Sequence, residues 1–114
     1  MNTTQLFEVF NHCASQKDPD QILALADSLQ IFCSSVFGDG KIYYGEDAPG
    51  AFRASFRDFC QNPNELDMRV KHRAGGNKNV VYVTDLRHNG KLSTSALNFG
   101  IIGDDWVTFV QTTD

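Results

Sequence analysis

The second half of the chain alternates between apolar and polar residues, and this alternation constrains the fold more than any other feature. From residue 65 onward, Leu66, Met68, Val70 and His72 alternate with charged residues, as in a strand with one buried and one solvent-facing side. Three turn sequences, AGGNKN, HNG and GDD, divide the remainder. We therefore predict four antiparallel strands, at residues 65–73, 79–86, 91–102 and 106–112.

Helical spacing replaces this alternation in the first half. Apolar residues recur every three or four positions over residues 4–15, which predicts an amphipathic helix. A second helix is predicted to begin at Pro19, because Asp18 can accept hydrogen bonds from its free N–H groups. A third is predicted from Asp47, as its cap, to about residue 62, where a proline follows.

Between the second and third helices the sequence changes to β-branched and aromatic residues. The stretches LQIFCSSVF and KIYY flank Gly-Asp-Gly at residues 38–40, which predicts a strand, a turn and a short second strand. Glycine suits the turn because a positive φ angle costs it little.

Length, charge and cysteine content exclude several classes of protein. With 114 residues and 41% hydrophobic content, the chain is expected to fold as one domain, 1–114, around one core. A net charge of −4 argues against nucleic acid as a partner. No apolar run is long enough to span a membrane, so we expect a cytoplasmic protein. Three widely spaced cysteines, with no C-x-x-C pair and no histidine at metal-ligand spacing, predict no metal site, and no cofactor is expected.

The order of elements, together with YGEDAPGAF at residues 44–52, resembles the nuclear transport factor 2 (NTF2) superfamily. This group includes ketosteroid isomerase and polyketide-cyclase-like proteins, and the resemblance covers nearly the whole chain. It implies an α+β fold in which a cone-shaped, curved antiparallel sheet wraps around three helices of the N-terminal half. It also suggests a homodimer.

The catalytic groups of the ketosteroid isomerase branch are not matched. That branch implies a tyrosine on the first helix, an aspartate near the end of the first strand and a protonated aspartate on a later strand. This chain has Phe10, Cys33-Ser34 and Leu97-Asn98-Phe99 in those regions. Isomerisation by that mechanism is therefore disfavoured.

A conical space between sheet and helices is where a ligand is expected to bind. The residues that we predict to contact it are Phe10, Cys33, Tyr44, Phe56, Tyr82, Asn98 and Trp106. If Leu66, Met68 and Val70 face inward, His72 does too, and it becomes the candidate general base. The plainer interpretation of His72 is that it ends a strand in solvent. The plainer interpretation of Tyr82 and Asn98 is that their polar groups only satisfy hydrogen bonds of buried backbone groups.

Both faces of the C-terminal strands are apolar. One predicted set contains Val81, Val83, Ala96, Val107 and Phe109. The opposite set contains Tyr82, Thr84, Leu97, Phe99, Trp106, Thr108 and Val110. A second apolar face has to be buried against another surface, so we predict a homodimer that forms through the sheet.

Three functions remain open. The first is a non-catalytic domain that binds a modest apolar small molecule in the cone. The second is a cofactor-independent isomerase, cyclase or dehydratase using His72, Tyr82 and Asn98. The third is an inhibitor or accessory protein that uses the polar strand edge of Arg69, Lys71, Arg73 and Arg87. A cone filled by aromatic side chains favours a scaffold or inhibitor role over ligand binding.

Overall fold

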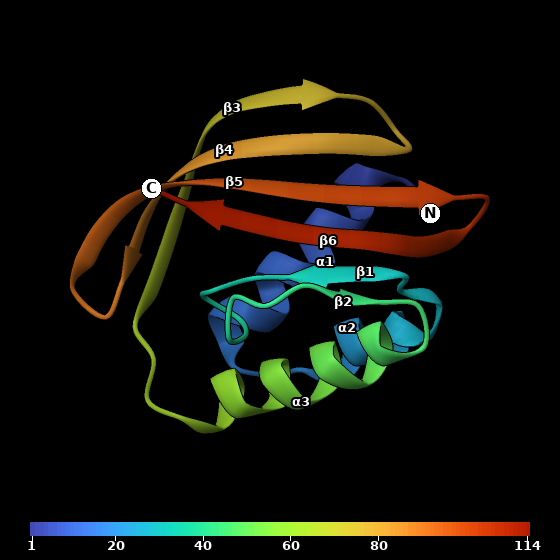
Figure 1. Cartoon of the computed structure of the whole chain (residues 1–114). Coiled ribbons are helices and arrows are strands. Elements are labelled where there is room, and N and C mark those ends of the chain that lie inside the picture. The colour runs from blue at the N-terminus through green and yellow to red at the C-terminus, as the bar shows by residue number, and fades with distance from the viewer.

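The computed structural model describes all 114 residues and has the predicted order of elements (Figure 1). The helical elements are α1 (Thr3–Gln16), α2 (Asp20–Ala24), the 3-10 turn η1 (Ala26–Ser28) and α3 (Asp47–Gln61). The strands are β1 (Ile31–Cys33), β2 (Tyr43–Tyr44), β3 (Leu66–Gly75), β4 (Asn79–His88), β5 (Lys91–Ile102) and β6 (Asp105–Thr113).

The six strands form one curved sheet in the order β2-β1-β6-β5-β4-β3. Figure 1 shows β3 to β6 arching over the helices, with α1 beneath the strands and α3 farthest from them. The predicted α+β cone is therefore confirmed. One strand pair departs from the antiparallel prediction, because β1 enters the sheet beside β6 and runs parallel to it.

Several boundaries differ from the prediction. Strands β1 and β2 have three and two residues, fewer than the sequence pattern predicted, because the segment between them is mostly bends around Gly38 and Gly40. Helix α2 begins at Asp20, with Pro19 at the cap position. Asp47 is the first residue of α3 and follows Glu46 at the cap.

Two β-bulges reverse which side chains point inward and which point outward along β3 and β6. In β3, Val70 pairs with Thr84 and His72 pairs with Val83, so Lys71 is an extra residue. In β6, Trp106 pairs with Ile101 and Thr108 pairs with Gly100, so Val107 is extra. Beyond each bulge, every side chain changes face relative to strict alternation.

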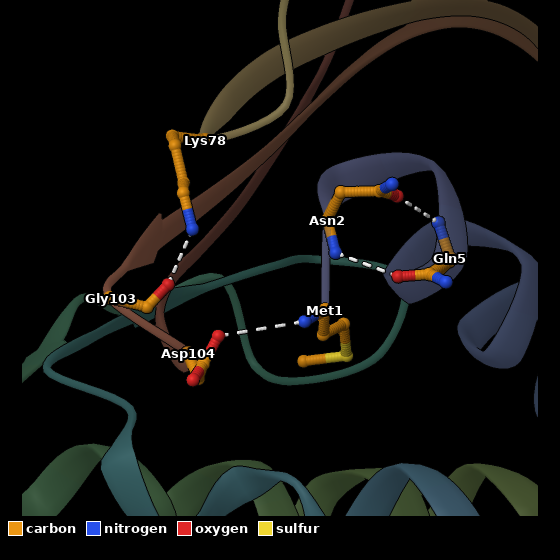
Figure 2. A network of polar contacts seen from close by, with 6 residues as sticks. All are labelled: Met1, Asn2, Gln5, Lys78, Gly103 and Asp104. Carbon is orange, nitrogen blue, oxygen red and sulfur yellow. Dashed lines mark hydrogen bonds and ion pairs between the residues drawn. The ribbon is translucent and has the colours of Figure 1, made fainter.

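The N-terminus is fixed to two turns at the sheet edge (Figure 2). Asn2 and Gln5 form a capping box that starts α1. The terminal ammonium lies 3.6 Å from Asp104, and Lys78 donates to the carbonyl of Gly103. The ammonium–Asp104 pair joins the N-terminus to the β5–β6 turn, and the Thr3 hydroxyl joins α1 to the β3–β4 turn by donating to the carbonyl of Gly76 at 2.6 Å.

The core lies between this inner face and the helices and contains 21 buried residues. Helix α1 contributes Leu6 and Phe10, and α3 contributes Phe52 and Phe56, each with no exposed surface. None of the helices is both long and apolar enough to cross a membrane.

Candidate functional site

The deep part of the cone is filled by aromatic rings. Phe10 contacts Phe109 at 5.0 Å and Phe99 at 5.5 Å between ring centroids, and Phe52 contacts Trp106 at 5.2 Å. All five side chains are at most 1% exposed. None of them lines any of the hollows found in the molecule.

Four of the predicted ligand-binding residues belong to this filled part. Phe10, Phe56 and Trp106 are packed within it, and Tyr82 stacks on Phe7 with the ring centroids 4.1 Å apart. They lie on the inner face as predicted, but they contact one another and their neighbours rather than an empty space.

The other three predicted residues lie outside the cone. Tyr44 is 65% exposed. Cys33 is paired with Val110 on the outer face, with its thiol 3.5 Å from the carbonyl of Gly40. Asn98 faces outward opposite Val81 and donates to the carbonyl of Val80 at 3.0 Å. The seven residues therefore do not converge on one site.

His72 also lies on the outer face, so its predicted inward orientation is wrong. The bulge at Lys71 places His72 opposite Val83, whereas Arg73 takes the inward position opposite Tyr82. The guanidinium of Arg73 lies 5.8 Å from the Tyr82 ring. For the same reason the bulge at Val107 brings Phe109 inside and turns Thr108 and Val110 outward, opposite to the prediction.

Toward the β4–β5 hairpin the inner face becomes polar. Gln111 accepts a hydrogen bond from the hydroxyl of Ser34 at 2.8 Å and donates to that of Ser95 at 2.9 Å. Ser34 also accepts from the backbone N–H of Phe37 at 3.0 Å. The neighbouring Thr84 hydroxyl is fully buried and has no partner. This end of the cone is thus built from polar groups that are costly to bury.

A hollow of about 190 Å³ opens beside this polar surface. Its walls are formed by Leu86 and His88 of β4, Lys91 and Ser93 of β5, Thr113 of β6, and residues 35–36 of the β1–β2 connection. Because hydroxyl groups of Ser35, Ser93 and Thr113 line it, we call it the hydroxyl hollow. No carboxylate is among its lining residues.

A groove of about 430 Å³ lies next to it, between residues 36–39 and helix α3. Helix α3 contributes Ala54, Ser55, Asp58 and Phe59, and Asn64 closes one end. Phe37 and Phe59 contact each other at 4.8 Å between ring centroids. We call this space the carboxylate groove, because Asp39 and Asp58 are the charged residues that line it.

The two spaces are neighbours. Val36 lines both of them. Nε2 of His88 in the hollow lies 3.2 Å from Oδ1 of Asn64 in the groove. We call the hydroxyl hollow and the carboxylate groove together the mouth of the cone.

Lys17 supplies positive charge behind the mouth. It ends α1 in the left-handed region, with φ of 55°, and its ammonium lies 4.0 Å from the Phe59 ring centroid. The ammonium is buried and has no hydrogen-bond partner. Burial lowers the pKa of Lys17, and burial followed by the charge of Lys17 lowers the pKa of His88. His88 is therefore neutral at pH 7.

Cysteine chemistry is disfavoured at this end of the molecule. Burial raises the pKa of the Cys60 thiol to about 11, although the charge of Lys17 opposes this shift. Burial also raises the pKa of Cys13. Both thiols stay protonated near neutral pH, and a thiol is a much weaker nucleophile than a thiolate.

The residues that form the mouth were not predicted from the sequence. A signal was present in β5, where Ser93 and Ser95 share the phase of Leu97 and Phe99 and so face inward with them. Lys17, His88 and Asp58 carried no comparable signal. Their proximity comes from the way α1, α3 and the hairpin meet in three dimensions.

Comparison with known proteins shows similarity in structure only. No protein-family model and no curated protein matches the sequence. An NTF2-like protein of unknown function from Cytophaga hutchinsonii superposes with a TM-score of 0.70 at 14% identity, over 100% of this chain and 92% of the other. The chain has the NTF2-like fold.

Further solved structures have the same NTF2-like fold. A putative SnoaL-like polyketide cyclase from Shewanella putrefaciens gives a TM-score of 0.72 at 13% identity, over 97% of this chain and 79% of the other. An NTF2-like protein of unknown function from Shewanella baltica gives 0.54 at 15% identity. At these identities the shared property is the fold, and function has to be argued from the residues of the mouth.

Proposed function

We propose that this NTF2-like protein binds a small molecule, without catalysis, at the mouth of the cone rather than deep inside it. The observation that carries the proposal is the change in the inner face from packed rings to hydroxyl and amide groups, where the hollow and the groove open. Polar groups concentrated beside an open space favour ligand recognition over simple packing.

The size and lining of the mouth favour a small ligand with apolar and polar parts. Small-molecule sites commonly have volumes of about 300–1,000 Å³, and the groove has about 430 Å³. Phe37 and Phe59 are buried in the wall of the groove, Val36 is a half-buried apolar residue, and Ser93 and Thr113 have hydroxyl groups.

A neutral fluorescent probe tests this proposal. N-phenylnaphthylamine fluoresces more strongly in apolar surroundings, so we expect a saturable increase with the wild-type protein. Ser55→Phe places a ring in the groove and should weaken probe binding at least tenfold. Arg57→Phe adds the same ring on the exposed side of α3 and should leave binding unchanged. Equal binding by both variants, or no saturable binding by the wild type, would contradict the proposal.

The second candidate is an enzyme of the isomerase, cyclase or dehydratase type. The set named from the sequence is divided, because His72 and Asn98 face outward and Tyr82 faces inward. One observation favours a different base: His88 is half-buried beside the hydroxyl hollow and neutral at pH 7. His88→Gln would then abolish turnover, whereas retained turnover would remove His88 from the mechanism.

We also propose a homodimer through the outer face of the sheet. The centre of this face contains Val81, Val83, Ala96 and Val110, and charged residues lie only at its margins. Tyr44 and Ile31 extend it at the other edge, 65% and 38% exposed. Stable interfaces bury about 800 Å² on each partner, which a face of several strands can supply.

Sedimentation measures this association directly. Val83→Glu places a charge at the centre of the face and should give monomers. Val70→Glu is the matched control, since Val70 is 43% exposed and lies on the inner side of the sheet, opposite Thr84. A wild-type protein that sediments as a monomer would contradict the dimer.

The three free cysteines fit a reducing, cytoplasmic location, which stays part of the proposal.

A further inference from the structure

The carboxylate groove holds two carboxylates that come from different walls. Asp39 in the β1–β2 connection accepts from the Tyr43 hydroxyl at 2.7 Å and from the Lys41 N–H at 2.9 Å. The hydrogen bond from Tyr43, followed by that from Lys41, lowers the pKa of Asp39. Asp58 on α3 accepts from the Asn62 side chain at 2.9 Å. Each carboxylate is therefore held in place by a hydrogen-bond donor, and each wall of the groove is negative.

The groove also has an aromatic surface between these carboxylates. Phe37 and Phe59 are packed against each other and line the same space. Aromatic rings and carboxylates together are the groups that recognise organic cations, through the ring quadrupole and direct charge attraction. No lysine or arginine lines the groove, although the Lys17 ammonium lies 4.0 Å from the Phe59 ring centroid. The two carboxylates therefore have to supply most of the attraction for a cation.

The hydroxyl hollow has the opposite character. Lys91 is its charged lining residue, the three hydroxyl groups can donate, and no carboxylate faces them. The Lys17 ammonium lies over the ring of Phe59, a groove residue, buried and without a hydrogen-bond partner. It is also near enough to His88 of the hollow that its charge, after burial, lowers the pKa of that imidazole. A buried ammonium without a counter-charge is unfavourable, so an anion in the hollow would gain from both lysines.

We propose that the mouth recognises a zwitterion, with the ammonium group of the ligand in the carboxylate groove and its carboxylate in the hydroxyl hollow. This inference rests on the proposed binding function and names the class of ligand. The two spaces share Val36, which supports the apolar middle of such a molecule. A ligand with a single charge would meet a complementary charge in only one of the two spaces.

Four probes with the same aromatic ring separate the contributions of charge. They are para-(aminomethyl)phenylacetic acid as the zwitterion, benzylamine as the cation, phenylacetate as the anion and benzyl alcohol as the neutral molecule. Affinities are measured from amide chemical shifts during NMR titration. The zwitterion should bind at least fivefold more tightly than each of the other three.

Two charge-neutralising variants locate the groups involved. Asp58→Asn should reduce the affinity for the zwitterion to that for phenylacetate, and Lys91→Gln should reduce it to that for benzylamine. Glu8→Gln on the exposed side of α1 and Lys71→Gln on β3 are the matched controls and should leave all four affinities unchanged. Both mouth residues are exposed, so these substitutions preserve the fold.

Each other outcome overturns the inference in a recognisable way. If benzylamine or phenylacetate binds as tightly as the zwitterion, the mouth uses one charge only and the inference fails. If all four probes bind equally at the mouth, the inference fails while the proposed binding function stands. If no probe binds and N-phenylnaphthylamine does not bind either, both fail together.

Discussion

The two ends of the inner sheet face differ in how they use the space beneath them. At the β5–β6 turn, Phe99, Trp106 and Phe109 pack against helix rings and leave no hollow. At the β4–β5 hairpin, Ser95 and Gln111 form a buried polar network next to open space. Burying rings stabilises the fold, whereas burying hydroxyls and amides does so only weakly. The filled end therefore contributes most of the stability, and the polar end is where we expect a ligand to bind.

The largest effect should come from the filled end. Phe109→Ala removes a ring with no exposed surface from contacts on several sides, and it should lower the free energy of unfolding by about 3–5 kcal/mol. Urea denaturation measures this loss. Val110→Ala changes the next residue on the outer face and should cost about 1 kcal/mol or less.

If Phe109→Ala does not fold, Phe109→Leu offers a milder comparison at the same position. Its loss should still exceed that of Val110→Ala. Similar losses at positions 109 and 110 would mean that the bulge at Val107 does not set the phase of β6 as described.

A smaller loss is expected when the polar network is broken. Gln111→Leu leaves the hydroxyls of Ser34 and Ser95 without the partner that joins them, and it should cost about 2 kcal/mol. Gln61→Leu, at the exposed end of α3, should change the free energy of unfolding by less than about 0.5 kcal/mol. Greater stability of Gln111→Leu would show that the polar end tolerates an apolar core.

The unpaired hydroxyl of Thr84 should respond in the opposite direction. Because Oγ1 is buried and has no partner, Thr84→Val removes a desolvation penalty while keeping the shape of the side chain. We expect an increase of about 1 kcal/mol in the free energy of unfolding. The exposed Thr112→Val serves as the control. A loss of stability at position 84 would indicate a buried water bound to this hydroxyl, and thus a wetter interior.

Much of the fold was predictable from the sequence because its signals are local. Helical spacing in residues 4–15 predicted α1, and the Asn-Gly turn at residues 89–90 predicted the β4–β5 hairpin. These features depend on neighbours within a few residues. The curved sheet followed from the resemblance to the NTF2-like fold, whereas the order of its strands and the parallel pairing of β1 with β6 were not predicted.

The candidate site was less predictable, for two physical reasons. Alternation of apolar and polar residues assigns side chains to the correct face only in unbroken strands, and one extra residue at Lys71 or Val107 reverses every assignment beyond it. His72 and Phe109 were assigned to the wrong faces in this way. The second reason is that the size of a cavity depends on how side chains fill it. Phe10 and Trp106 were placed on its wall, and they occupy its interior instead.

The smallest predicted effect concerns the pH dependence at the polar end. Burial lowers the pKa of His88 below its ordinary value of 6.5, so the native state binds a proton there less readily than the unfolded state does. The contribution of His88 to stability is fully present above pH 6.5. It is lost progressively as the pH falls toward the native pKa. His88→Gln should therefore flatten part of the decrease in unfolding free energy between about pH 7.5 and about pH 5.

A matched substitution separates this effect from general acid denaturation. His12→Gln makes the same substitution at an exposed position on α1 and serves as the control. If His88→Gln and His12→Gln give the same slope, burial of His88 has no effect on stability, and the polar end of the cone is open to water throughout. A flatter slope for His88→Gln alone would place the boundary between packed and open regions behind His88, beside Phe59, whose ring centroid lies 6.2 Å from that of the imidazole.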